Sequence, residues 1–124
     1  MPKKKLHFNR LIRDGIIDKM NSKKLEYKVE KLSQKDFIKE LKAKIPEEAE
    51  GVVNAKNKKE LIKELADLVF VIEEVKKRMK ISPLAFNKAM KDNIEKKGGF
   101  KKKMYLYWTN DDGYRTNEKR ESKK

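Results

Sequence analysis

The chain has 124 residues, of which 34 are lysine or arginine and 20 are aspartate or glutamate, giving a formal net charge of +14. This length suits one domain with a modest core, and the absence of cysteine excludes disulfide frameworks and thiolate zinc sites. The longest apolar stretch, residues 65–72, is far too short to cross a bilayer and contains Asp67. We therefore expect a cytoplasmic protein without a membrane partner.

The N-terminal third of the chain predicts only short elements. Residues 6–20 indicate an extended arm followed by a short helix. Apolar and charged residues then alternate with a period of two, which is typical of a half-exposed strand. The apolar members of this alternation are Leu25, Tyr27 and Val29.

Helical periodicity dominates the middle of the chain. Three helices are expected, over residues 34–55, 59–80 and 83–97. Ser33 is a residue type that caps helix N-termini, and Pro83 suits the first turn of the last helix. Pro46 is expected to interrupt or kink the first helix, because proline lacks a backbone N–H.

The C-terminal segment again predicts a short strand. Gly98 and Gly99 should end the last helix, and Asp112-Gly113 is a turn signal. Between them, alternating apolar and aromatic residues indicate a second candidate strand, at Met104, Leu106 and Trp108.

These elements together predict a mainly α fold, a helical bundle with a small peripheral β-hairpin or sheet. We expect one domain over residues 1–116, because no linker is long enough to divide the chain. Residues 117–124 are charged and poor in apolar residues, so we expect a disordered tail there.

Acidic residues concentrate in one part of this basic chain. Residues 47–74 contain 8 acidic and 4 basic side chains, whereas both flanks are strongly basic. Grouped carboxylates suit a hard divalent cation such as Mg²⁺, which prefers oxygen ligands. Basic flanks suit a polyphosphate substrate, so the distribution indicates a site for both.

The helical phase of two glutamates supports a metal site. At about 100° per residue, Glu64 falls inside the apolar arc of its helix, and Asp67 lies at the edge of that arc. Glu48 falls on the apolar side of the preceding helix. Burying a carboxylate is costly unless it is paired or metal-bound, so Glu48 and Glu64 are expected to face each other across a cation. Solvated salt bridges with nearby lysines are the alternative interpretation, and for Glu48 it stays open.

Four segments carry a family resemblance that extends over residues 7–107. In chain order they are FNRLIRD at 8–14, KIPEEAE at 44–50, ELIKELADL at 60–68 and GGFKKKMYL at 98–106. With these segments the chain resembles the MazG-like, all-α nucleotide pyrophosphohydrolases, in particular the phosphoribosyl-ATP pyrophosphohydrolase-like members. The resemblance implies a helical bundle of the all-α NTP pyrophosphatase type.

The resemblance also implies a reaction and a metal. Such enzymes hydrolyse nucleoside triphosphates or related nucleotides to a monophosphate and pyrophosphate with Mg²⁺, and Mn²⁺ is an expected substitute. Their ligand motifs, Glu-x-x-Glu and Glu-x-x-Asp on consecutive helices, correspond to Glu48, residue 51, Glu64 and Asp67. Residue 51 is glycine here, so one carboxylate of the pattern is missing.

Four further residues are candidates for contacts with water and phosphate. Glu47, beside the ligand positions, is the candidate for orienting or deprotonating the attacking water. Arg13, Lys44 and Lys97 are the candidates for binding the substrate phosphates, since arginine offers bidentate contacts and lysine a point charge.

Two alternative functions are compatible with the sequence, and a homo-oligomeric assembly is expected. A nucleotide-binding relative with weak or lost catalysis would share the fold, with Gly51 at the ligand position as the reason. A nucleic-acid-binding module would account for the net charge, although no recognition motif is present. A homo-oligomer, dimer or tetramer, is expected because a short chain leaves apolar surface uncovered.

Overall fold

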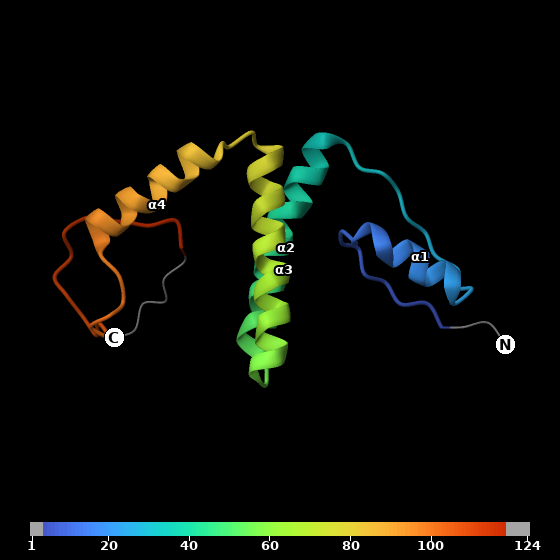
Figure 1. The fold of residues 1–124 in the computed structure, drawn as a ribbon, viewed down its shortest axis with the longest axis horizontal. Helices are drawn as coiled ribbons and strands as arrows, with labels where there is room; N and C mark the ends of the chain where they lie inside the picture. Colours follow the sequence, from blue (N-terminus) through green and yellow to red (C-terminus); the bar gives the residue numbers. More distant parts are fainter. Residues whose placement is uncertain (1–3, 119–124) are drawn as a thin grey trace. The chain divides into compact units, whose positions relative to one another are not determined.

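The computed structural model describes residues 4–118, and this range contains four helices (Figure 1). They are α1 (Asp14–Ser22), α2 (Gln34–Asn54), α3 (Lys58–Arg78) and α4 (Pro83–Lys97). The expectation of a mainly α fold is confirmed. The chain divides into two units, and the boundary falls between Asn87 and Lys88, within α4. None of the described helices is long and apolar enough to cross a membrane.

Side-chain caps start the two long helices, each within one residue of the expected start. The Ser33 hydroxyl accepts a hydrogen bond from the backbone N–H of Asp36 at 3.2 Å, at the start of α2. The Asn57 side chain accepts one from the N–H of Glu60 at 2.9 Å, at the start of α3. These bonds satisfy N–H groups that have no partner within the helix.

Helices α2 and α3 form an antiparallel pair joined by residues 55–57, and they lie side by side along their length (Figure 1). Pro46 lies inside α2 without ending it, since the helix continues to Asn54. A proline weakens an isolated helix, and packing of an apolar face against a neighbour offsets that loss. The expected interruption is therefore absent, and the kink expected as its alternative stays a prediction.

The contact between α2 and α3 supplies a small core. Leu41 of α2 and Val71 of α3 are the buried hydrophobic residues of the described range, each with only 6% of its surface exposed. Other large apolar residues of α3 are exposed to solvent; these are Leu61, Ile62, Leu65, Val69 and Phe70. One side of the pair is thus covered and another remains open.

The expected β-hairpin or sheet is wrong for the described residues. Neither residues 25–29 nor residues 104–108 form a strand, and Leu25, Tyr27 and Val29 are exposed. A strand cannot satisfy its own backbone groups and needs a partner, and an isolated two-stranded hairpin is marginal in water. Alternation of side chains therefore did not suffice to form one.

The second unit contains the end of α4 and the turn that follows residue 110. Gly98 ends the helix with a φ of +73°, and its N–H donates to the carbonyl of Ile94 at 2.8 Å. The single domain expected over residues 1–116 stays a prediction. The expected disordered tail falls largely on residues 119–124, which lie outside the described range.

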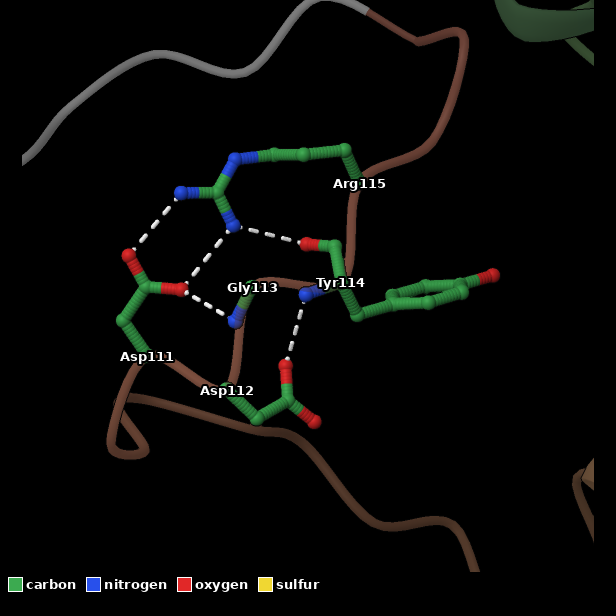
Figure 2. A network of polar contacts seen from close by, with 5 residues as sticks. All are labelled: Asp111, Asp112, Gly113, Tyr114 and Arg115. Atoms are coloured by element: carbon green, nitrogen blue, oxygen red, sulfur yellow. Dashed lines mark hydrogen bonds and ion pairs between the residues drawn. The ribbon is translucent and has the colours of Figure 1, made fainter.

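A network of local hydrogen bonds holds the turn at residues 111–115 (Figure 2). The carboxylate of Asp111 accepts a hydrogen bond from the N–H of Gly113 at 2.8 Å, and that of Asp112 accepts one from the N–H of Tyr114 at 2.9 Å. The Arg115 guanidinium donates to both carboxylate oxygens of Asp111, which raises the pKa of Arg115. The turn expected here is confirmed.

Candidate metal and phosphate site

Three carboxylates converge between α2 and α3. Glu48 comes from α2, and Glu64 and Asp67 come from successive turns of α3. One oxygen atom of each carboxylate lies within 4.8 Å of the other two. Glu48 and Glu64 are partly buried, whereas Asp67 is exposed. The antiparallel packing of the two helices therefore brings Glu48 close to two acids that lie 16 and 19 residues further along the sequence.

Basic side chains contact two of these three carboxylates. The Nζ atom of Lys44 lies 3.9 Å from an oxygen of Glu48, and an Nη atom of Arg13 lies 3.8 Å from an oxygen of Asp67. No basic residue of the described range forms an ion pair with Glu64. Negative charge is thus only partly compensated at this point, and the like charges repel one another.

A pocket of about 310 Å³ lies beside the acids. Its lining combines four of the residues singled out from the sequence with apolar side chains of both helices. The four are Arg13, Lys44, Glu48 and Asp67. A concave surface that combines apolar walls with a few convergent charges is typical of a small-molecule site.

Two arginines in the pocket lie over aromatic rings. The guanidinium carbon of Arg13 is 3.9 Å from the centre of the Phe70 ring, and that of Arg78 is 5.3 Å from the centre of the Phe37 ring. Arg78 also pairs with Glu74 at 3.5 Å. Such stacking holds the planar guanidinium groups in defined orientations.

Sequence reasoning missed Phe70, Glu74 and Arg78 as pocket residues. A usable signal was present: residues 67, 71, 74 and 78 follow the spacing of four and three that lines one face of a helix. Extending the face of Asp67 by three turns would have found Arg78.

Glu47 and Lys97 are the two remaining residues that the sequence predicts for the site. Glu47 is exposed, and its carboxylate lies 3.6 Å from the Nζ atom of Lys44. Lys97 is the last residue of α4, within the second unit, and is exposed. The roles assigned to both from the sequence stay predictions.

Gly51 lies against Glu64. A Cβ atom built on Gly51 would be 2.9 Å from Cδ of Glu64 and in closer contact still with its Oε2 atom. The carboxylate of Glu64 thus occupies the space into which a side chain at position 51 would project. Position 51 carries no ligand atom of its own.

The chemistry of the three donors fits a divalent metal ion. All three are carboxylate oxygens, the ligands that hard cations such as Mg²⁺ prefer. Opposite ligands of an octahedral Mg²⁺ ion are about 4.2 Å apart and adjacent ones about 3.0 Å, and at most one pair among three ligands can be opposite. The three oxygens, which lie within 4.8 Å of one another, would therefore need to approach by up to roughly 2 Å. Side-chain rotation supplies such a movement.

Comparison with known proteins places the chain in a family. Residues 8–92 match the model of the family described as phosphoribosyl-ATP pyrophosphohydrolase. The match includes the segments at 8–14, 44–50 and 60–68 and ends before the segment at 98–106. No curated protein and no solved structure matches the chain. Because the match covers well over half of its length, the chain belongs to the phosphoribosyl-ATP pyrophosphohydrolase family, an all-α family of nucleotide pyrophosphohydrolases.

Proposed function

We propose that this protein hydrolyses a nucleoside triphosphate or a related nucleotide to the monophosphate and pyrophosphate, with Mg²⁺ as the metal. The convergence of Glu48, Glu64 and Asp67 beside a pocket lined by Arg13 and Lys44 is the observation that carries the proposal. Carboxylates for the metal and cations for the phosphates are the two groups that such a substrate requires.

The three carboxylates would hold the metal ion between α2 and α3. When bound there, Mg²⁺ lowers the pKa of a coordinated water and offsets the negative charge of the phosphates. Mn²⁺ has the same ligand preference and should substitute for it. Because α2 and α3 are joined by only three residues, their packing fixes Glu48 relative to Glu64 and Asp67.

Arg13 and Lys44 would bind phosphate oxygens. Both line the pocket, and each lies within 4 Å of a carboxylate that is proposed to bind the metal. The Phe70 ring orients the guanidinium of Arg13, which favours bidentate contact with a phosphate. The apolar lining, which includes Leu41 and Val71, is available to the nucleoside part of the substrate.

Glu47 is the proposed base. Its carboxylate is exposed, and Lys44 lies between it and Glu48, 3.6 Å from one and 3.9 Å from the other. Lys44 thereby holds Glu47 near the proposed metal site, although Glu47 is not one of the three proposed metal ligands. A carboxylate in that place can orient a water molecule and accept its proton. Lys97 remains a third proposed phosphate contact.

The protein is also proposed to assemble as a homo-oligomer, a dimer or a tetramer. The exposed apolar residues of α3 support this, because Ile62 and Val69 are each more than half exposed. A second copy that covered this face would remove apolar surface from water. Light scattering should give at least twice the mass of 14.7 kDa. A monomer at concentrations of tens of micromolar would contradict it.

A product analysis tests the proposed reaction. The chain is incubated with each common nucleoside triphosphate and with phosphoribosyl-ATP in the presence of Mg²⁺, and pyrophosphate and phosphate are measured separately. We expect pyrophosphate and nucleoside monophosphate in equal amounts, and no product with EDTA. Release of inorganic phosphate alone would contradict the proposed site of cleavage.

The same assay separates the alternatives. Nucleotide binding without any pyrophosphate release would indicate a family member that has lost catalysis. Nucleic-acid binding that survives EDTA, decreases steeply with salt and occurs without turnover would favour the binding module instead.

A further inference from the structure

We infer that Gly51 is a positioning residue for the metal site: its missing side chain provides the space in which the carboxylate of Glu64 approaches Glu48. This inference rests on the proposed metal-binding function. It replaces the interpretation of Gly51 as a lost ligand, because the space at position 51 is already filled by a carboxylate from α3.

The contact at Gly51 is specific within this chain. A Cβ atom there would be 2.9 Å from Cδ and 3.6 Å from Cγ of Glu64, and closer still to Oε2. At each of the other four glycines a Cβ atom would have no heavy atom within 4 Å. Gly51 is therefore the glycine whose substitution forces another side chain to move.

The backbone gives no separate reason for a glycine at this position. Gly51 lies inside α2, and it is not among the glycines with a positive φ. Glycine weakens a helix interior relative to alanine, and α2 already contains Pro46. Room for the Glu64 side chain is what a glycine provides here.

Moving the Glu64 side chain would separate its carboxylate from those of Glu48 and Asp67. The atoms that a Cβ would meet belong to the flexible end of the Glu64 side chain, so the chain can relieve the contact by rotating that carboxylate away. Rotation would increase its distance from Glu48 and Asp67, which now lie within 4.8 Å of it. A methyl group at position 51 should then weaken metal binding while leaving all three ligands in the sequence.

The test compares Gly51→Ala with the unmodified chain in two measurements. Alanine is the better helix former, so the melting temperature of the metal-free protein should rise or stay unchanged. Affinity for Mg²⁺ and Mn²⁺, measured by calorimetric titration, should fall roughly tenfold, the lower range found when support for a metal ligand is lost. A substitution that only stabilised or only damaged the helix would not produce these opposite changes.

Gly15→Ala is the matched control. Gly15 is also a helical glycine, in α1, and nothing lies within 4 Å of its added Cβ atom. This variant should keep the metal affinity of the unmodified chain.

Shortening the side chain at position 64 provides an independent test of the inference. In a Glu64→Asp background the carboxylate is one methylene shorter and withdraws from position 51, so adding Gly51→Ala should change the affinity less than about twofold. Non-additivity of this kind reports direct coupling between two positions. Equal losses in both backgrounds would show that the methyl group acts elsewhere and would overturn the inference.

The remaining outcomes separate the inference from the proposed function. If the unmodified chain binds Mg²⁺ and Gly51→Ala binds it equally well, the inference is wrong and the proposed function stands. If the unmodified chain binds neither Mg²⁺ nor Mn²⁺, both are overturned. Gly51→Glu should also lower the affinity, because the larger side chain requires the same displacement of Glu64; a gain in affinity would restore the lost-ligand interpretation.

Discussion

The α2–α3 pair and the segment that follows α4 had equally regular sequence patterns, and only the first formed the expected structure. The pair has helical periodicity and caps, and its helices begin within one residue of the expected positions. Residues 104–108 alternate like a strand but have no regular structure, and Tyr105, Tyr107 and Trp108 are each more than three-quarters exposed. A helix satisfies its backbone within one segment, whereas a strand depends on a partner.

The largest expected effect concerns the proposed metal site between α2 and α3. Glu64→Gln keeps the shape of the side chain and removes its charge, so pyrophosphate release with Mg²⁺ should fall by more than the roughly 10- to 100-fold that loss of an outer-shell partner costs. Glu73→Gln is the control, because Glu73 lies on the same helix, is exposed and pairs with Lys76. Unchanged turnover in Glu64→Gln would remove the metal-based mechanism.

The next prediction concerns the small core of the pair. Val71→Ala should lower the free energy of unfolding by about 1–2 kcal/mol, because Val71 is buried and a fully buried valine contributes about 1.5–3 kcal/mol. Val53→Ala is matched in chemistry and helix propensity, but Val53 is 81% exposed, so its effect should stay within about 0.5 kcal/mol. Urea denaturation followed by circular dichroism measures both. Equal effects would mean that the α2–α3 contact contributes little.

Loss of the α3 cap should have a smaller effect. Asn57→Ala leaves the N–H of Glu60 without its acceptor and should cost about 1 kcal/mol, the usual value for such a cap. Asn57→Asp keeps an acceptor in the same place and should retain most of the stability. If both variants were equally destabilised, the hydrogen bond would not be the reason why α3 begins at this residue.

The smallest expected effect concerns the segment that follows α4. Trp108 is the single tryptophan and is 81% exposed, so acrylamide should quench its fluorescence almost as efficiently as that of a free indole. Trp108→Phe should leave the melting temperature of the chain unchanged. A blue-shifted, protected emission would show that this segment is covered in solution and would weaken the contrast with the helix pair.

Local physical chemistry explains how far prediction from the sequence reached. Ser33 and Asn57 act on N–H groups three residues away, and Gly98 permits a positive φ at its own position. Interactions of such short range are visible in sequence. Arg78 lies on the same face of α3 as Asp67, which the spacing in the sequence indicates, but that this face meets α2 and lines the pocket depends on the packing of the two helices.

The amino-acid sequence alone was enough to predict the long helices, their first residues to within one position, the acidic character of residues 47–74 and the place of Glu64 in the apolar arc of its helix. Tertiary structure decided that Glu48, Glu64 and Asp67 converge and that Gly51 lies against a carboxylate. It also decided that the alternating segments form no strand among the described residues. Helix formation depends on neighbours within four residues, whereas a metal site and a strand both require groups that only the packing of distant segments brings together.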